Sequence, residues 1–384
     1  MNALWFILVI VALVALQSNL YKKNIFKNLI IEREFERKAV FPGEKTALKL
    51  TIHNKKFFPI TYLKLQQKIP VELSMKKSKL VEKQDKVKYL HNTVLSMLPF
   101  QKVTRKFEVV ATKRGIYNLF DGIKAFSTDL FGAEEYEVEL PAPSRLIVYP
   151  RLIDLKSFRL IANSLYGDLF VRRWIIEDPV IISGVRDYTT SDSFKSINWK
   201  VTAKTQKLKV NKYDYTADKK IVLFFNVDFH RYVFRVEEIE KFERAIEVAA
   251  TLSVNLIKEG IPVGFSTNAI CLAEGDYTFV EPSAGEGQIA RLLEIFAGLS
   301  FLKKYSVEDM ASYLSKTLSW GTDLLVVTPF VDEGMLCLVE RFFGDKDVML
   351  VYMSSKGIEN VPHNVKLFYY SEEGKEIEVV EVVG

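Results

Sequence analysis

The sequence predicts a multidomain α+β protein with an N-terminal transmembrane helix, an antiparallel β-sandwich and a doubly wound α/β domain. Three patterns support this fold class: the first 21 residues carry no charged side chain, the next part of the chain tends to alternate apolar and polar residues, and the last part alternates apolar runs with helical stripes. We expect a membrane anchor at 1–21, a sandwich at 28–150, a connector at 151–218 and the α/β domain at 219–384.

The first segment predicts the location of the protein. The stretch from Met1 to Tyr21 is close to the ~20 apolar residues that a helix needs to cross a bilayer. It lacks the basic start and the clear small-x-small cleavage site of a secretory signal peptide, which favours a retained anchor over a cleaved leader. Basic residues follow directly, beginning with Lys22, Lys23 and Lys27. Because Lys and Arg are enriched on the cytoplasmic side, we expect a single-pass protein of the cell membrane with most of the chain in the cytoplasm.

Residues 28–150 have the pattern of an antiparallel β-sandwich with short strands. Apolar residues alternate in the runs TALKLTIHN, TYLKLQQKIP, KFEVVA and RLIVYP, and turn signals such as FPGEK and TKRG separate them. The rhythm resembles that of an immunoglobulin-like domain, without the Cys-Trp-Cys core of antibody domains. A sandwich next to a membrane is more often a spacer or docking module than an enzyme.

Beyond residue 219 the hydrophobic period changes to that of an α/β domain. The run KIVLFFNVD is typical of a strand buried on both faces, and a helical stripe over residues 236–257 stops at Gly260. Further strands are predicted at IPVGFST, TDLLVVTPF, VMLVYMSS and NVKLFYY, and further helices at GEGQIARLLEIFAGLS, SVEDMASYLSKTL and DEGMLCLVERFFG. Strands that alternate with helices in this way predict a doubly wound sheet.

The bulk composition argues against several classes of function. With 53 basic and 48 acidic residues in 384, the net charge of +5 is too dilute for a dedicated nucleic-acid-binding protein. The two cysteines, Cys271 and Cys337, supply neither a disulfide framework nor a zinc-ligand pair, and we expect both to be buried free thiols. The four histidines stand singly, and neither a phosphate loop nor a Gly-x-Ser-x-Gly motif occurs. We therefore predict no catalytic residue, no cofactor and no metal ion.

The end of the first buried strand is where an α/β domain of this kind would bind a ligand. Asp228 stands at this end, His230 follows it, and Thr328 and Asp332 lie at a later strand end of the same edge. The arrangement resembles a von Willebrand factor A domain, whose metal site uses Asp-x-Ser-x-Ser after this strand. Here His230 and Tyr232 replace the serines, which makes a poor oxygen set for Mg²⁺. We favour a strand-end edge that has lost its metal site. The alternative is an enzyme or a metal-dependent ligand binder with its site near Asp228.

The connector carries an unusual cluster of polar and aromatic residues. Those at fixed spacing are Gly184, Arg186, Tyr188, Asp192, Asn198, Trp199 and Lys200. Arg186 can form a bidentate pair with Asp192, and such a pair fixes geometry. Asn198 can cap a turn and Trp199 can serve as a large anchor. Asp192 stands among cations, so we expect it to stay ionised and not to donate a proton at neutral pH.

Three interpretations of this cluster differ in what it contacts. The favoured one is a conformational lock that holds the connector against the α/β domain. The second is a surface that docks a partner protein, with the lysines of residues 200–212 at its rim. The third, weaker one is nucleic-acid binding through the same lysines. However, polar and apolar residues alternate over residues 207–211, as expected for a strand with one solvent-exposed face.

The spacing of the cluster resembles the core motif of the domain-of-unknown-function 58 family. The pattern is Gly184-x-Arg186-x-Tyr188, then Asp192-Ser193, Asn198-Trp199-Lys200 and Leu208-x-Val210. The resemblance extends to the N-terminal segment, to RGIYNLFDGIKAFSTDLFG and to a degenerate von Willebrand factor A-like domain. It implies no catalytic activity but a partnership with a MoxR-type AAA+ ATPase. We therefore expect a membrane-anchored interaction scaffold that helps to assemble or activate a membrane-associated complex, and no binding of nucleic acid.

Overall fold

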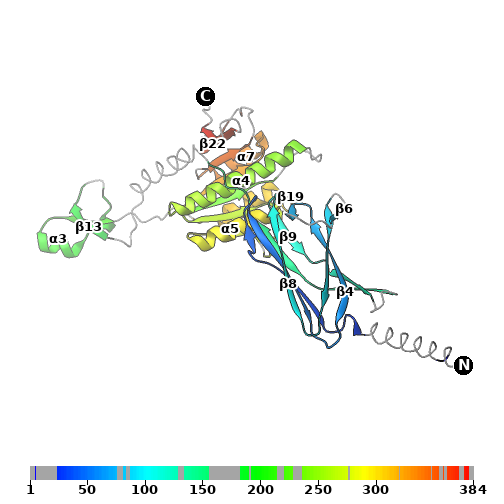
Figure 1. Ribbon diagram of the computed structural model, residues 1–384. Helices are drawn as coiled ribbons and strands as arrows, with labels where there is room; N and C mark the ends of the chain where they lie inside the picture. Colours follow the sequence, from blue (N-terminus) through cyan, green and yellow to red (C-terminus); the bar gives the residue numbers. More distant parts are fainter. Residues whose placement is uncertain are drawn as a thin grey trace. The chain divides into compact units, whose positions relative to one another are not determined.

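The computed structural model describes two compact units. The described residues are 5, 24–75, 81–83, 87–128, 134–154, 182–189, 192–213, 220–227, 236–275, 277–319, 321–346, 348–353, 358, 361–371 and 376–379. One unit comprises Met1–Arg151 with Phe296–Gly298, and the other Leu152–Ile295 with Leu299–Gly384. Figure 1 shows both units, coloured along the sequence from blue at the N-terminus to red at the C-terminus.

The first unit is a β-sandwich. Its strands form sheets of four, five and three strands with the orders β1-β3-β8-β5, β11-β10-β4-β7-β6 and β2-β12-β9. The strands are β1 (Leu29–Phe35), β2 (Ala39–Val40), β3 (Lys45–Asn54), β4 (Ile60–Pro70), β5 (Leu73–Met75), β6 (Val81–Lys83), β7 (Lys88–Met97), β8 (Lys102–Ala111), β9 (Gly115–Leu119), β10 (Ile123–Thr128), β11 (Glu135–Leu140) and β12 (Ser144–Val148). The four strands predicted from alternating runs, β3, β4, β8 and β12, are confirmed.

Alternation along the strands explains why two of these sheets pack face to face. In β1, every second residue is buried, and Ile31 from this strand shares a core with Ile52 of β3. Leu63 of β4 and Ile123 of β10 enter the same core from the five-stranded sheet. A strand that buries one face in this way needs a second sheet opposite it, so the sequence pattern dictates the sandwich.

The second unit contains a seven-stranded mixed sheet. Its order is β18-β16-β15-β20-β21-β22-β23, in which the five inner strands run parallel and the two outer ones pair antiparallel. The strands are β15 (Lys220–Phe225), β16 (Val263–Thr267), β18 (Phe279–Ser283), β20 (Thr322–Thr328), β21 (Val348–Tyr352), β22 (Val365–Ser371) and β23 (Glu376–Val379). A separate pair is formed by β17 (Ala269–Cys271) and β19 (Leu299–Lys303).

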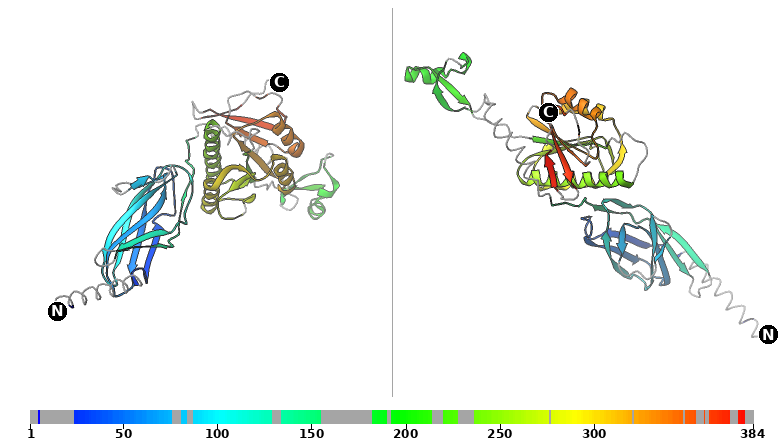
Figure 2. Two further views of the ribbon diagram at one scale, coloured as in Figure 1. Left: turned by 90° about the vertical axis from the view of Figure 1, so that its right-hand side faces the viewer. Right: turned by 90° about the horizontal axis from the view of Figure 1, so that it is seen from above.

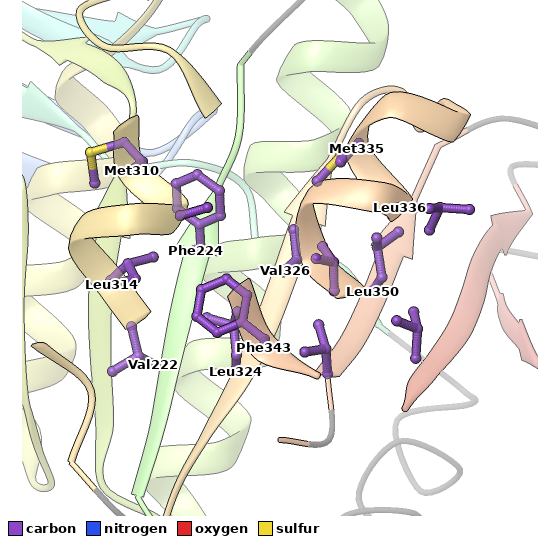
Figure 3. Packing of buried hydrophobic residues seen from close by; sticks show 14 of the residues in the cluster. Val222, Phe224, Met310, Leu314, Leu324, Val326, Met335, Leu336, Phe343 and Leu350 are labelled. Atoms are coloured by element: carbon purple, nitrogen blue, oxygen red, sulfur yellow. The ribbon is translucent and has the colours of Figure 1, made fainter. Parts of the chain in front are cut away.

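Helices pack on both faces of this sheet. They are α4 (Val236–Lys258), α5 (Glu286–Gly298), α6 (Val307–Thr317) and α7 (Glu333–Phe343). Figure 3 shows Leu314 of α6 and Phe343 of α7 directed toward Val222, Leu324 and other residues on one face. The ring of Phe225, which follows Phe224 and therefore points to the opposite face, contacts Phe242 of α4 at a centroid distance of 5.9 Å. All four helices and the five inner strands were predicted from periodicity.

The predicted fold class nevertheless needs correction at the N-terminus. Within the described ranges, no helix combines the length and the apolar character that crossing a membrane requires. The longest of the described helices, α4, has 23 residues, but charged residues such as Glu240, Lys241 and Arg244 interrupt its first half. The predicted transmembrane helix is therefore not shown, and its segment, residues 1–21, lies outside the described residues except for Trp5.

Within the second unit, residues 182–189 and 192–213 are called the motif lobe. It contains the hairpin of β13 (Ile182–Asp187) and β14 (Lys209–Tyr213), a 3₁₀ turn η1 (Phe194–Ser196) and the short helix α3 (Trp199–Thr205). In Figure 2 it is the green hairpin with its helix. Alternation predicted β14, whereas α3 has only seven residues and gives too short a periodic signal to detect.

Candidate functional site

The motif lobe has a minimal core of its own. In the hairpin, Arg186 lies opposite Val210 and Asp187 opposite Lys209. Ile197 forms an isolated bridge with Val210, and both side chains are buried. So few apolar contacts leave most of the stabilisation of the lobe to its polar groups.

The first polar element is the pair of Arg186 and Asp192. Arg186 Nη1 donates to Asp192 Oδ2 at 2.7 Å, and Nη2 donates to Oδ1 at 2.5 Å. The backbone N–H and the hydroxyl of Thr189 also donate to Oδ2, each at 2.8 Å. These hydrogen bonds, chiefly that from Arg186, hold the pKa of Asp192 well below its usual range. The predicted bidentate pair and the ionised carboxylate are therefore confirmed, and Asp192 closes the loop that follows β13.

The second polar element is Asn198, which joins α3 to β14. Its Oδ1 accepts a hydrogen bond from Val201 N at 3.1 Å, so Asn198 is the N-cap of α3, as predicted. Its Nδ2 donates to Asn211 Oδ1 at 2.6 Å. Thr202 Oγ1 accepts from Lys209 N at 3.0 Å. Asn198 and Thr202 thus connect α3 to β14, and these hydrogen bonds set the orientation of α3 on the hairpin.

The outer surface of the lobe is aromatic and basic. Trp199 is 66% exposed and Phe194 72%, and the Phe194 ring stacks on Tyr188 at 5.9 Å. The exposed or half-buried lysines around them are Lys195, Lys200, Lys204, Lys207 and Lys209. Asp187, the second carboxylate of the described lobe, pairs with Lys209 at 2.8 Å, and this contact lowers its pKa. The lobe is therefore cationic around two exposed rings.

The predicted motif residues thus separate into two groups. Arg186, Asp192 and Asn198 build the lobe, and Gly184 stands at an irregularity of β13. Trp199 and Lys200 lie on the exposed side of α3. Trp199 is 66% exposed, and the buried apolar side chains among the described residues of the lobe are Ile197 and Val210.

At the carboxyl ends of the parallel strands, polar side chains bond to one another. Asn226 follows β15, Asn268 follows β16 and Thr328 ends β20, and all three are at most 2% exposed. Asn268 Nδ2 donates to Asn226 Oδ1 at 2.8 Å, and Asn226 Nδ2 donates to Thr328 Oγ1 at 3.1 Å. Thr328 Oγ1 in turn donates to Phe330 O at 2.7 Å, and Asn268 Oδ1 accepts from Val227 N at 2.8 Å. We call these three residues the strand-end network.

Two of the predicted edge residues, Thr328 and Asp332, form hydrogen bonds at the strand ends. The hydroxyl of Thr328 is already engaged as donor and acceptor. Asp332 is the N-cap of α7, where its Oδ1 accepts from Met335 N at 2.8 Å. Asp228 and His230 lie outside the described residues. Among the residues that are described, no three His, Cys, Asp or Glu side chains are grouped as metal ligands.

The two asparagines of this network were missed at the sequence level. Their signal is nevertheless visible, because an amide stands directly after an apolar strand in both FFNVD and FSTNAI. The prediction that both cysteines are buried is also wrong: Cys337 is exposed on α7, and Cys271 is half-buried.

Comparisons with known proteins place the motif lobe and the mixed sheet in one family region. The family described as "Protein of unknown function DUF58" matches residues 184–381, just over half of the chain. A similar protein is the "Uncharacterized protein YeaD" of Bacillus subtilis (strain 168), 21% identical over 359 residues, which cover 90% of this chain and 81% of that protein.

Solved structures give only faint likenesses. The CARDB domain of a Pyrococcus furiosus protein has a TM-score of 0.19 and 15% identity, over 31% of this chain and 93% of that one. A non-cellulosomal cohesin from Archaeoglobus fulgidus has a TM-score of 0.22 and 11% identity, over 31% and 90%. Scores this low carry no argument. The von Willebrand factor A-like domain of the predicted fold class is not shown, and the sheet is mixed, with both outer strands antiparallel.

Proposed function

The chain belongs to the DUF58 family, and we propose that it is a non-enzymatic interaction scaffold at the cytoplasmic face of the cell membrane. In this proposal it acts with a MoxR-type AAA+ ATPase to assemble or activate a membrane-associated complex. The partner class comes from the family resemblance of the motif Gly184 to Val210. The location is supported by the uncharged residues 1–21 and the lysines that follow them.

One observation carries the interaction role. The polar side chains of Arg186, Asp192 and Asn198 form hydrogen bonds within the motif lobe and stabilise its conformation. Trp199 and Phe194 remain exposed among lysines. Tryptophan is enriched among the residues that dominate binding energy at protein interfaces, and cations around it steer an oppositely charged partner. We infer that the partner offers an apolar pocket with an acidic rim.

The proposed function is tested by binding of the full chain to a MoxR-type ATPase from the same organism. Trp199→Ala should weaken the affinity about tenfold or more, because interface tryptophans commonly contribute ~2 kcal/mol. Phe120→Ala is the matched control, since Phe120 is a similarly exposed aromatic residue (73%) in the sandwich. Equal affinity of the two variants, or no binding by the unaltered chain, would contradict the proposal.

A further inference from the structure

A second apolar surface lies at one end of the β-sandwich. Four large side chains are exposed there: Phe57 by 76%, Phe58 by 46%, Leu98 by 67% and Phe100 by 63%. They come from two loops, one between β3 and β4 and the other between β7 and β8. We call these four residues the sandwich tip. Scattered exposed apolar residues are ordinary, but a cluster on one tip marks an interaction site.

Hydrogen bonds join the two loops into one structure. Asn54 is fully buried, and its Nδ2 donates to Phe58 O at 3.0 Å and to Leu98 O at 2.9 Å. Phe100 N donates to Lys56 O at 3.2 Å. The rings of Phe57 and Phe58 meet edge to face at 6.5 Å. The sandwich tip is therefore a preformed surface rather than two independent loops.

The backbone at Phe100 adds a second indication. Phe100 has a φ of 56°, in the left-handed region that glycine or asparagine adopts most easily. A bulky residue is disfavoured there because its Cβ comes too close to the following carbonyl oxygen. Because the ring is also largely exposed, it contributes little packing to offset that cost. An exposed aromatic ring at a strained position suggests that the ring is kept for a contact outside the sandwich.

The two tip loops and the segment before β1 carry charges of one sign, while Glu32 of β1 lines a pocket together with Lys55 and Lys102. Residues 22–28, 54–60 and 97–102 contain no Asp or Glu. Lys27, Lys55 and Lys102 are exposed in these segments. Aromatic side chains beside lysines match the interfacial region of a bilayer, where rings sit at headgroup level and anionic lipids attract lysines.

The N-terminal part of the chain enters the sandwich at this same end. Ile25 is buried, and its carbonyl accepts a hydrogen bond from Lys56 Nζ. Lys55 N donates to Asn28 O at 3.0 Å. The uncharged stretch of residues 1–21 therefore joins the described chain beside the tip loops. A lipid surface explains this continuity, whereas a protein partner would leave it unexplained.

We propose that the sandwich tip docks on an anionic lipid bilayer, with its aromatic rings in the interfacial region. The lysines at 27, 55 and 102 then face the headgroups, and the long axis of the strands stands away from the membrane. This inference rests on the proposed membrane location, but not on the proposed protein partner.

The test places a fluorescent probe at each end of the sandwich in the full chain. Phe57→Cys carries an environment-sensitive dye in a background with Cys271→Ser and Cys337→Ser, and the chain is reconstituted with vesicles of phosphatidylcholine and phosphatidylglycerol. Lys113→Cys is the matched control, because it follows β8 at the opposite end, about ten residues or ~30 Å along the strands. Nitroxide-labelled lipid then reports the distance of each dye from the bilayer.

Docking predicts a blue-shifted emission and several-fold stronger quenching at position 57 than at 113. Adding Phe58→Ser, Leu98→Ser and Phe100→Ser should reduce both effects at position 57. If the chain floats with the vesicles but the two dyes are equally unquenched, the docking of the tip is wrong and the membrane location stands. If the chain does not float with the vesicles, both are wrong.

Discussion

The strand-end network and the motif lobe use polar side chains in opposite ways. At the strand ends, Asn226, Asn268 and Thr328 are buried and satisfy one another. In the lobe, the fork of Arg186 on Asp192 lies near the surface and shapes a loop beside exposed aromatic rings. Both are hydrogen-bonded constructions, but only the lobe leaves a large apolar side chain in the solvent.

This difference separates a buried polar network from a surface that is open to contact. A buried polar network that is fully satisfied stabilises one conformation and offers few groups to a ligand. Aromatic residues that stay exposed on an ordered surface can still be buried against a partner, and this burial stabilises a complex. Within the described residues, the strand ends are held by their own hydrogen bonds, whereas the lobe leaves Trp199 and Phe194 exposed to solvent.

The largest expected effect breaks the strand-end network. Asn268→Ala removes the hydrogen bonds of Asn268 with Val227 N and with Asn226 Oδ1, and the loss of these two buried hydrogen bonds should cost about 2–4 kcal/mol of unfolding free energy in the second unit. Chemical denaturation measures this loss. Asn118→Ala, at an exposed position of β9, should stay within about 0.5 kcal/mol. A loss for Asn268→Ala no larger than that of the control would show that the network is not structural.

A smaller effect should come from opening the fork in the lobe. Asp192→Asn keeps the shape of the side chain but cannot accept both guanidinium N–H groups as a carboxylate does. We expect roughly tenfold weaker binding of the ATPase with little change in denaturation midpoint, because only the lobe is disturbed. The matched control is Asp187→Asn, whose carboxylate makes an exposed pair with Lys209.

Hydrogen exchange adds a direct readout of that fork. The Thr189 amide donates to Asp192 Oδ2 and should exchange faster in Asp192→Asn but not in Asp187→Asn. Faster exchange without weaker binding would separate the fork from the partner surface. Weaker binding by Asp187→Asn of the same size would assign the effect to charge alone.

In the smallest expected effect, hydrogen-exchange protection of the Thr189 amide stays constant as the pH changes. Hydrogen bonds from Arg186 and then from Thr189 lower the pKa of Asp192 in the folded chain. A carboxyl group with a lowered pKa stabilises the fold above its unfolded pKa and loses that contribution only as the pH falls through the folded pKa. From about pH 7 to about pH 5, above the ordinary pKa of ~3.9, protection of the Thr189 amide should therefore not change after correction for intrinsic exchange. A loss of protection in that range would contradict the fork.

Sequence patterns predicted the regular elements well because each is defined by its own periodicity. The stripe from Ile239 to Ile257 gives α4, and the continuous run of Ile221 to Phe225 gives the buried β15. The pair of Arg186 and Asp192 and the cap at Asn198 were predictable as well, since the partners lie within a few residues.

Contacts between distant segments were beyond local patterns. Asn226 and Asn268 are 42 residues apart, and only the parallel pairing of β15 with β16 brings their amides together. The loops of Phe58 and Leu98 meet through the buried Asn54 amide in the same way. The sequence alone did not decide between a conformational lock and a docking surface at Trp199, and only the structure gives its exposure of 66%.

The most direct measurement compares the two regions by photo-crosslinking in native membranes. A photoreactive phenylalanine analogue replaces Trp199 in the lobe in one chain and Phe330, beside Thr328 at the strand ends, in another. Our account predicts that position 199 crosslinks to a protein, identified by mass spectrometry as a AAA+ ATPase, and that position 330 does not. Crosslinks from position 330 with none from position 199 would contradict it.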